Sequence, residues 1–180
     1  FRVLIVDDSE SLSRYHATVL EQAGMVARVI TNPMEIMTPL LEFSPDLILM
    51  DVYMPECNGL ELAKVIRQLE AFVSTPIVYL SAEKDLDKQF SAMSLGGDDF
   101  LVKPIQAQHL TSSLRNRIER SRLLRSFMVR DSLTGLLNHT AIKDQLDREL
   151  ARSERMRTPL SFAMIDIDFF KQVNDTYGHP

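Results

Sequence analysis

The sequence predicts a doubly wound α/β fold, in which a five-stranded parallel sheet carries helices on both faces. Two observations support this class. Short apolar runs alternate with helical patterns over about 115 residues, which is the order of strand and crossover helix in a parallel sheet. The runs are rich in Val, Ile and Leu and are too short for helices, as expected of strands buried on both faces.

Each predicted element has a recognisable beginning or end. Strands are predicted at 2–6, 25–30, 47–50, 76–80 and 98–102. Helices are predicted at about 9–22, 34–41, 59–71 and 85–95, and a fifth follows Lys103 and Pro104. Ser9 suits the N-cap of the first helix, and glycines end the first and fourth because they tolerate left-handed backbone.

Composition excludes several classes of protein. The chain of 180 residues is 45% hydrophobic and 25% charged, which is ordinary for a globular protein. Its apolar runs are far shorter than the roughly 20 residues that span a bilayer, so no membrane partner is expected. A single cysteine, Cys57, excludes an internal disulfide and, with no signal peptide before Phe1, favours a cytoplasmic location.

One stretch departs from the overall charge of −5. Residues 115–130 carry six Arg and one Glu, a density also found in nucleic-acid-binding proteins. No helix-turn-helix, zinc-finger spacing or aromatic-basic sheet motif accompanies it. We therefore interpret the stretch as a solvated helix face and expect no specific nucleic acid partner.

Polar side chains follow the predicted strands. The C-terminal ends of parallel strands meet at one edge of the sheet, where ligands of such folds bind. The ends of the first, third, fourth and fifth strands carry Asp7 and Asp8, Asp51, Ser81 and Lys103. An isolated Asp51 would be interpreted as a turn cap, but these positions together indicate a site.

The residue types indicate its chemistry. Crowded carboxylates repel one another unless a cation lies among them, and oxygen ligands without His or Cys favour Mg²⁺. The Lys103 ammonium and the Ser81 hydroxyl would stabilise a phosphoryl group transferred to Asp51. Aspartate is a nucleophile in such transfers and forms an aspartyl phosphate.

Residues 1–115 resemble the receiver domain of bacterial two-component response regulators, which has a flavodoxin-like fold. The motifs that carry the resemblance are Asp7 with Asp8, Asp51 with Met54, Pro55 and Gly59, Ser81 with Ala82, and Lys103 with Pro104. The resemblance implies that Asp51 accepts a phosphoryl group from a sensor histidine kinase.

The same resemblance implies roles for neighbouring groups. Asp8, Asp51 and the backbone carbonyl of Tyr53 would bind Mg²⁺, and Asp7 would hold its water shell. Ser81 and Lys103 would contact the phosphoryl group, and Lys103–Pro104 would be a cis peptide. Phe100 stands where the family has an aromatic residue whose rotamer reports phosphorylation; Tyr is more common there, and Phe lacks its hydroxyl.

A long helix is predicted to link this domain to the rest of the chain. Residues 106–130 contain no Gly or Pro, and apolar residues recur at spacings of three or four. The recurring positions are Leu110, Leu114, Ile118, Ser121, Leu124 and Met128. The first half suits packing on its own sheet, and for the Arg-rich second half we favour pairing with the same helix of a second copy.

Residues 131–180 begin a second domain. A turn at 131–138, a helix from Thr140 to about Arg155 and a strand at 160–166 are predicted. Asp166 and Asp168, followed by Lys171 and Asn174, suit a metal-bound nucleoside phosphate, although this spacing of Asp also occurs in plain turns.

This segment resembles the opening of a diguanylate cyclase domain, the family named for its Gly-Gly-Asp-Glu-Phe (GGDEF) loop. The two motifs span 131–138 and 166–179, and His139 stands where the family usually has Arg. By that resemblance Asp166 and the carbonyl of Ile167 would bind Mg²⁺. Backbone amides near Phe169 and Phe170, with Lys171, would hold the phosphates of GTP, and Asn174 would contact guanine.

These observations predict a phosphorylation-dependent response regulator, acting as a homodimer, that controls the conversion of two GTP into cyclic di-GMP. The GGDEF loop does not occur within these 180 residues, so this chain alone is expected to be inactive as a cyclase. One alternative is a non-catalytic scaffold or nucleotide receptor with a degenerate output domain. A DNA-binding regulator that uses the basic helix is a further alternative.

Overall fold

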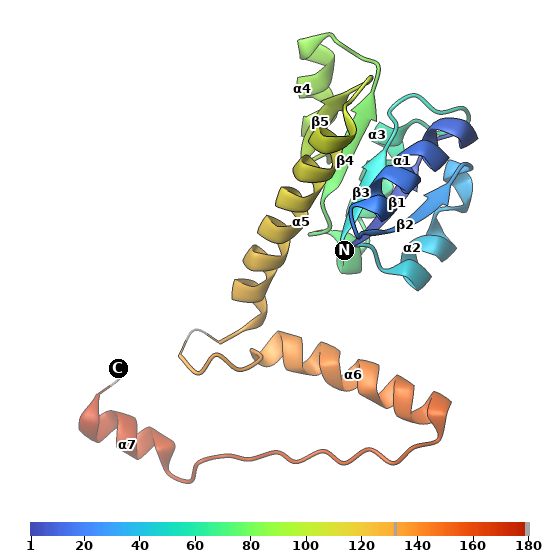
Figure 1. The fold of residues 1–180 in the computed structure, drawn as a ribbon. Helices are drawn as coiled ribbons and strands as arrows, with labels where there is room; N and C mark the ends of the chain where they lie inside the picture. Colours follow the sequence, from blue (N-terminus) through green and yellow to red (C-terminus); the bar gives the residue numbers. More distant parts are fainter. Residues whose placement is uncertain (132, 179–180) are drawn as a thin grey trace. The chain divides into compact units, whose positions relative to one another are not determined.

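The computed structural model describes residues 1–131 and 133–178 (Figure 1). The chain divides into two compact units, Phe1–Met128 and Val129–Pro180. Among the described helices, none combines the length and the apolar composition that crossing a bilayer requires.

A five-stranded parallel sheet forms the centre of the first unit, with strand order β2-β1-β3-β4-β5. Its strands are β1 (Arg2–Val6), β2 (Val26–Ile30), β3 (Leu47–Met50), β4 (Ile77–Ser81) and β5 (Asp99–Val102). Every residue of β3 and β4 is buried, which explains their uninterrupted apolar runs. The predicted fold class is confirmed.

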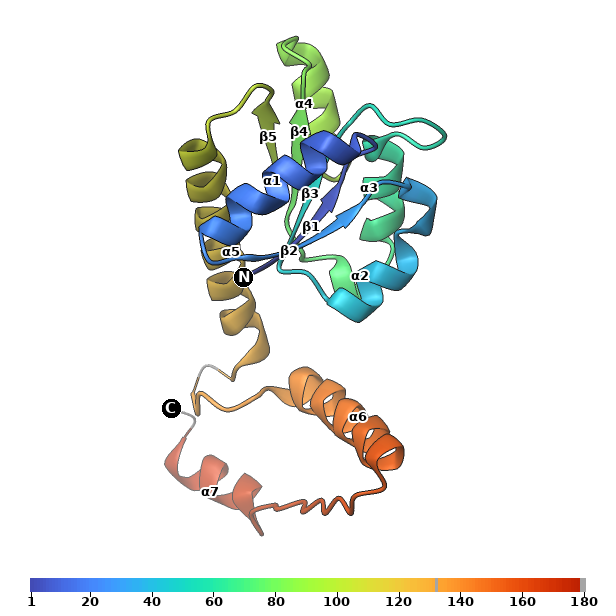
Figure 2. The ribbon, with the colours of Figure 1, turned by 45° about the vertical axis from the view of Figure 1, so that its right-hand side comes forward.

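Helices cover both faces of this sheet, with α1 and α5 on one side and α2 and α3 on the other (Figure 2). The helices of the unit are α1 (Glu10–Gln22), α2 (Met37–Phe43), α3 (Gly59–Arg67), α4 (Leu86–Ser94) and α5 (Ala107–Val129). Leu110, Leu114 and Ile118 of α5 are fully buried or nearly so and pack with β1, β3 and β4 residues. The first half of the long helix therefore packs on its own sheet, as predicted, whereas the side chain of Met128 lies outside the described residues.

Two predicted helices are shorter than expected. The helix predicted at 34–41 is instead a 3₁₀ turn, η1 (Pro33–Glu35), followed by α2. A continuous helix would have placed Pro39, which has no N–H, in its interior; in α2 it lies in the first turn, where no N–H is needed. The helix predicted at 59–71 ends at Arg67, because Leu69 is extended and a second 3₁₀ turn, η2 (Glu70–Phe72), follows.

The second unit contains α6 (His139–Met156) and α7 (Phe170–Tyr177). The turn before α6 follows the motif, since Asp131 Oδ1 accepts a 2.8 Å hydrogen bond from the Thr134 N–H and Gly135 is left-handed. Asn138 then caps α6 by accepting from the Ala141 N–H at 3.0 Å. Asp131, Thr134, Gly135 and Asn138 of the motif thus have local structural roles.

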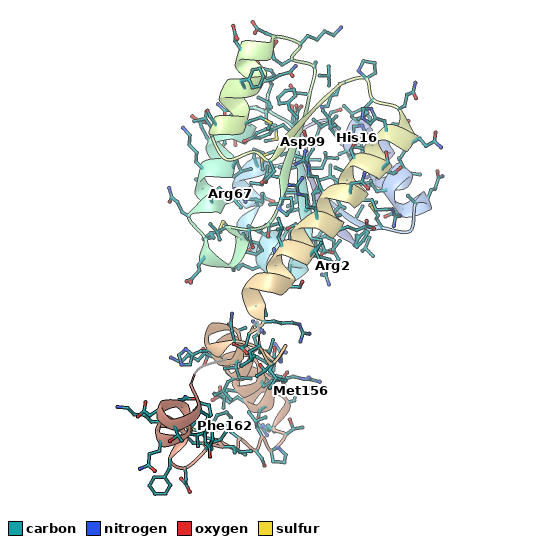
Figure 3. The ribbon with its side chains drawn as sticks, turned by 90° about the vertical axis from the view of Figure 1, so that its left-hand side faces the viewer. Arg2, His16, Arg67, Asp99, Met156 and Phe162 are labelled. Atoms are coloured by element: carbon teal, nitrogen blue, oxygen red, sulfur yellow. The ribbon has the colours of Figure 1, made fainter. Side chains whose placement is uncertain are left out.

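The strand predicted at 160–166 is wrong. Residues 157–169 lie between α6 and α7 without strand pairing, and Phe162 is 58% exposed (Figure 3). A strand satisfies its backbone groups only through a neighbouring strand, and the described part of the second unit offers none. The apolar pattern is present in the sequence, but no described residues pair with this segment as a strand.

Arg67 at the end of α3 holds together the loops that precede β4 and β5 (Figure 3). Its guanidinium donates to the carbonyl oxygens of Phe72 (3.1 Å), Val73 (3.2 Å), Thr75 (2.7 Å) and Gly96 (3.0 Å). It also pairs with the Asp98 carboxylate at 2.6 Å, which accepts in turn from the Ile77 N–H at 2.8 Å. One side chain therefore sets where two strands begin.

We expect Arg67→Met to lower the free energy of unfolding by about 2–4 kcal/mol, because several carbonyls and a carboxylate lose a charged donor together. Urea unfolding of the full chain measures the change. Arg14→Met is the matched control, since Arg14 makes only an exposed pair with Glu10 and should cost less than about 0.5 kcal/mol. Equal effects of the two substitutions would contradict the role assigned to Arg67.

Candidate functional site

Three carboxylates meet at the C-terminal edge of the sheet. Asp7 and Asp8 follow β1 and Asp51 follows β3, and each offers an oxygen within 4.8 Å of the others. Asp7 is buried, Asp51 is partly buried and Asp8 is exposed. The adjacent positions of β1 and β3 in the sheet produce this cluster, as the strand-end pattern predicted.

Lys103 lies among the carboxylates. Its ammonium is 2.8 Å from Asp7 Oδ2 and 3.1 Å from Asp51 Oδ2, and its side chain is largely buried. The Lys103 N–H donates to the Ser81 carbonyl at 2.8 Å, which ties the end of β5 to the end of β4. The Lys103–Pro104 peptide is cis, as the resemblance implies.

Burial and charge act in opposite directions on Asp51. Burial raises the pKa of its carboxyl, while the Lys103 ammonium and the 2.8 Å hydrogen bond from the Val52 N–H act to lower it. The net shift is upward. A second positive charge near Asp51 would therefore favour the ionised carboxylate that a nucleophile needs.

The donor set fits a hard divalent cation. Every candidate ligand is an oxygen, and neither His nor Cys belongs to the cluster. Three carboxylates facing a single ammonium leave excess negative charge at this edge. Tyr53 lies in the loop two residues after Asp51, with its side chain exposed and its hydroxyl donating to Glu83 at 2.7 Å.

Ser81 and Phe100 lie on the neighbouring strands β4 and β5. Ser81 is fully buried at the end of β4, and its hydroxyl oxygen accepts a weak hydrogen bond from the Glu83 N–H at 3.4 Å. Phe100 is partly buried against the core, with its ring centroid 6.2 Å from that of Tyr79. Burial raises the pKa of Tyr79 to about 12, so this neighbour stays neutral.

Gly59 begins α3 directly against Asp51. A Cβ at this position would lie 2.1 Å from the Asp51 carbonyl oxygen, and the Gly59 N–H donates to the Val52 carbonyl at 2.9 Å. Only glycine allows this approach.

Ser9 occupies the predicted N-cap of α1, but its side chain makes no capping bond. Its N–H donates to Asp7 Oδ1 at 2.9 Å instead.

Sequence reasoning missed His16. It is buried on α1, its Nδ1 has no partner among the described residues, and burial followed by the charge of Lys103 lowers its pKa. His16 lines a groove of about 430 Å³ with Tyr15, Lys103 and Pro104, next to the carboxylates. The spacing of His16 four residues before the fully buried Leu20 is the one signal that indicated burial.

The predicted nucleotide residues of the second unit are exposed and less organised. Asp166 Oδ1 accepts from the Ile167 N–H at 2.9 Å, and Lys171 and Asn174 lie about one turn apart on α7. Asp166, Ile167, Phe169 and Phe170 are all exposed, and Phe169 is left-handed. In residues 1–131 and 133–178, the only cluster of three possible metal-ligating side chains is the one at Asp51; His179 lies outside the described residues.

Comparison with known families assigns both parts of the chain. Residues 3–115 match the response regulator receiver domain, and residues 128–180 match the diguanylate cyclase, GGDEF domain. The first match agrees with the sheet, the strand order and the acidic cluster. The second begins at the end of α5 and covers the whole second unit.

Two relatives align with nearly the whole of this chain and are longer than it. Response regulator PleD of Caulobacter vibrioides is 31% identical over 99% of this chain, which covers 41% of that protein. An uncharacterized 76.5 kDa protein of Thiocystis violacea is 34% identical over 99% of this chain, which covers 26% of it. The chain thus spans between about a quarter and two fifths of these relatives.

Among solved structures, the chemotaxis protein CheY4 of Vibrio cholerae is 30% identical with a TM-score of 0.61. The alignment covers 64% of this chain and 96% of CheY4. The similarity therefore corresponds to the first unit and supports the same fold there.

The raised pKa of Asp51 predicts a pH dependence of stability. A carboxyl with a raised folded-state pKa contributes stability that is present below the ordinary value of 3.8 and is lost as the pH rises through the raised value. When a chelator has removed metal ions, the Asp51→Asn variant does not lose stability in this way, because its amide does not ionise. We therefore expect its stability relative to wild type to increase as the pH rises above about 4, measured by urea unfolding.

Asp46 provides a control of opposite sign. Burial acts to raise its pKa, but hydrogen bonds from the Arg122 side chain and the Arg2 backbone lower it overall. Its contribution is present at neutral pH and is lost on acidification, so Asp46→Asn should lose stability relative to wild type as the pH rises. Parallel pH profiles for the two variants would contradict the assignment.

Proposed function

This chain belongs to the response regulator receiver family, and from that membership we propose that Asp51 accepts a phosphoryl group from a sensor histidine kinase and thereby controls a diguanylate cyclase output. The observation that carries the proposal is the Lys103 ammonium, 2.8 Å from Asp7 and 3.1 Å from Asp51. It places a fixed positive charge beside a partly buried carboxylate, as phosphoryl transfer requires.

In the proposed transfer, an Asp51 carboxylate oxygen attacks the phosphorus of a phosphohistidine. A P–O bond forms, the P–N bond breaks, and the imidazole leaves with the electron pair and takes up a proton. Lys103 stabilises the charge on the phosphoryl oxygens, and the Ser81 hydroxyl donates to one of them. Gly59 keeps the first turn of α3 against the acceptor and leaves no room for a side chain there.

Mg²⁺ is the cofactor that the donor set suits best. We assign Asp8, Asp51 and the Tyr53 carbonyl to it, with Asp7 holding its water shell. When bound, Mg²⁺ would supply positive charge beside the phosphoryl oxygens.

We assign the output to GTP chemistry in the second unit. Asp166 and the Ile167 carbonyl would hold a metal, the amides near Phe169 and Phe170 with Lys171 would hold phosphates, and Asn174 would contact guanine. Joining two GTP into cyclic di-GMP requires two such sites face to face. Phosphorylation would promote this by pairing two copies through α4, β5 and α5, with Phe100 responding to the phosphoryl group.

The proposal favours this output over DNA binding because much of the basic stretch is already engaged. Arg115 donates to the Ala23 carbonyl, and Arg117 and Arg122 pair with Asp99 and Asp46. These guanidiniums stabilise the contact of α5 with its own unit. They do not form a free face for phosphates of a duplex.

Asp51→Asn is expected to abolish acetyl-phosphate-dependent phosphorylation and dimerisation, because the amide is not a nucleophile. Mass spectrometry and light scattering measure the two effects, with Mg²⁺ present. Asp147→Asn, an exposed Asp on α6, is the matched control and should behave as wild type. Dimerisation that responds equally in Asp51→Asn would refute control through Asp51.

The output is tested separately with protein made from the uninterrupted reading frame, incubated with GTP and Mg²⁺ with and without acetyl phosphate. Cyclic di-GMP that increases with acetyl phosphate in wild type, and not in Asp51→Asn, is the expected result. No product under either condition would favour a degenerate output domain that acts as a scaffold or nucleotide receptor.

A further inference from the structure

The six arginines of residues 115–130 fall into two groups. Four have fixed partners: Arg115 with the Ala23 carbonyl (3.0 Å), Arg117 with Asp99 (2.5 Å), Arg122 with Asp46 (2.7 Å) and Arg130 with the Gly135 carbonyl. Arg120 and Arg125 have no ion pair or acceptor in the part of the chain that the structure describes. The basic stretch therefore holds two uncommitted guanidiniums.

Both uncommitted arginines line the same pocket. The pocket has a volume of about 390 Å³ and lies between α5 and the loops that precede β4 and β5. Ser74 and Asp98 contribute from the loops, and Arg117 and Leu124 contribute from α5. It lies at the N-terminal edge of the sheet, where β4 and β5 begin, and is thus distinct from the Asp51 site at the opposite edge.

Arg125 is the stronger indication of a ligand. Its Nε is hidden from solvent and has no hydrogen-bond acceptor in the described residues. A buried charged donor without an acceptor is costly, and folded proteins rarely leave one. An acceptor in the pocket would remove this cost.

Asp98, the carboxylate that lines the pocket, does not neutralise the positive charge of its arginines. Asp98 already pairs with Arg67 at 2.6 Å, and Arg117 pairs with Asp99. Arg120 and Arg125 therefore leave two positive charges in excess. The exposed Leu124 and the buried Pro76 add apolar surface beside them.

We propose that this pocket binds a small molecule that contains a diphosphate group. Each guanidinium presents a planar fork that matches two oxygens of one phosphate, so two free arginines suit two linked phosphates. A volume of about 390 Å³ is in the range of small-molecule sites. The apolar surface at Leu124 suits the uncharged part of a nucleotide, whereas inorganic pyrophosphate would use the arginines alone.

Binding at this place would connect two parts of the first unit. The loop before β4 already contacts α5, since the Ser121 hydroxyl donates to the Ser74 carbonyl at 3.2 Å. A ligand held by Arg120 and Arg125 would add a second connection between α5 and this loop, and would hold the turns of α5 that contain the two arginines. This inference does not depend on phosphorylation of Asp51.

Isothermal titration calorimetry of the full chain with pyrophosphate tests the proposal, at constant ionic strength and with metal ions removed. We expect saturable binding with one site per chain. Arg120→Gln and Arg125→Gln should each raise Kd about tenfold or more, because each removes one charged fork. Arg125→Lys keeps the charge but loses the fork and should recover only part of the affinity.

The matched control combines Arg14→Gln with Lys64→Gln, which removes two exposed positive charges on α1 and α3. It should bind as wild type does, and thermal melts establish that every variant is folded. Equal weakening by the control, or no saturable binding to wild type, would overturn the proposal. The proposal would also be overturned if polyglutamate bound to Arg120 and Arg125 and pyrophosphate did not.

A parallel titration with ATP distinguishes the source of the diphosphate. Tighter binding of ATP than of pyrophosphate, with the same dependence on Arg120 and Arg125, would support a nucleotide ligand. Tighter binding of pyrophosphate, again with that dependence, would support an inorganic ligand. Affinity for ATP that is unchanged in the two variants would place ATP elsewhere and count against the pocket.

Discussion

The position of the Lys103 ammonium between Asp7 and Asp51 is the interaction on which the acidic edge depends. Three carboxylates within 4.8 Å would repel one another without it. Lys103 is placed by the pairing of β5 with β4, because its N–H donates to the Ser81 carbonyl. The register of the parallel sheet therefore determines the electrostatics of the site, and any shift of β5 would change the charge that Asp51 experiences.

The two edges of the sheet differ in how their charges are balanced. Carboxylates gather where the strands end, next to the first turns of the helices that follow. Arginines gather where the strands begin, and Arg67 is itself the last residue of α3. Asp46, Asp98 and Asp99 also lie at that edge, and each of them pairs with an arginine. The charges there are therefore matched, whereas three carboxylates share one ammonium at the opposite edge.

The sequence predicted what depends on local pattern. Buried strands are visible as apolar runs, and strand ends place Asp7, Asp8, Asp51 and Lys103 together. Contacts between distant side chains were not visible: nothing near Arg67 indicates that it joins two loops, and nothing local reveals that Nε of Arg125 lacks an acceptor. The strand predicted at 160–166 was wrong for a related reason, because an apolar pattern does not show whether a neighbouring strand is present to pair with it.

The extended segment between α6 and α7 also affects how the chain behaves in solution. Phe162, Met164 and Ile165 are 58%, 85% and 91% exposed on backbone that has no strand neighbour. Apolar side chains on an unpaired extended backbone are a template for intermolecular strand addition, which is the first step of aggregation. Association through this segment would therefore grow with protein concentration, independently of the state of the Asp51 carboxylate.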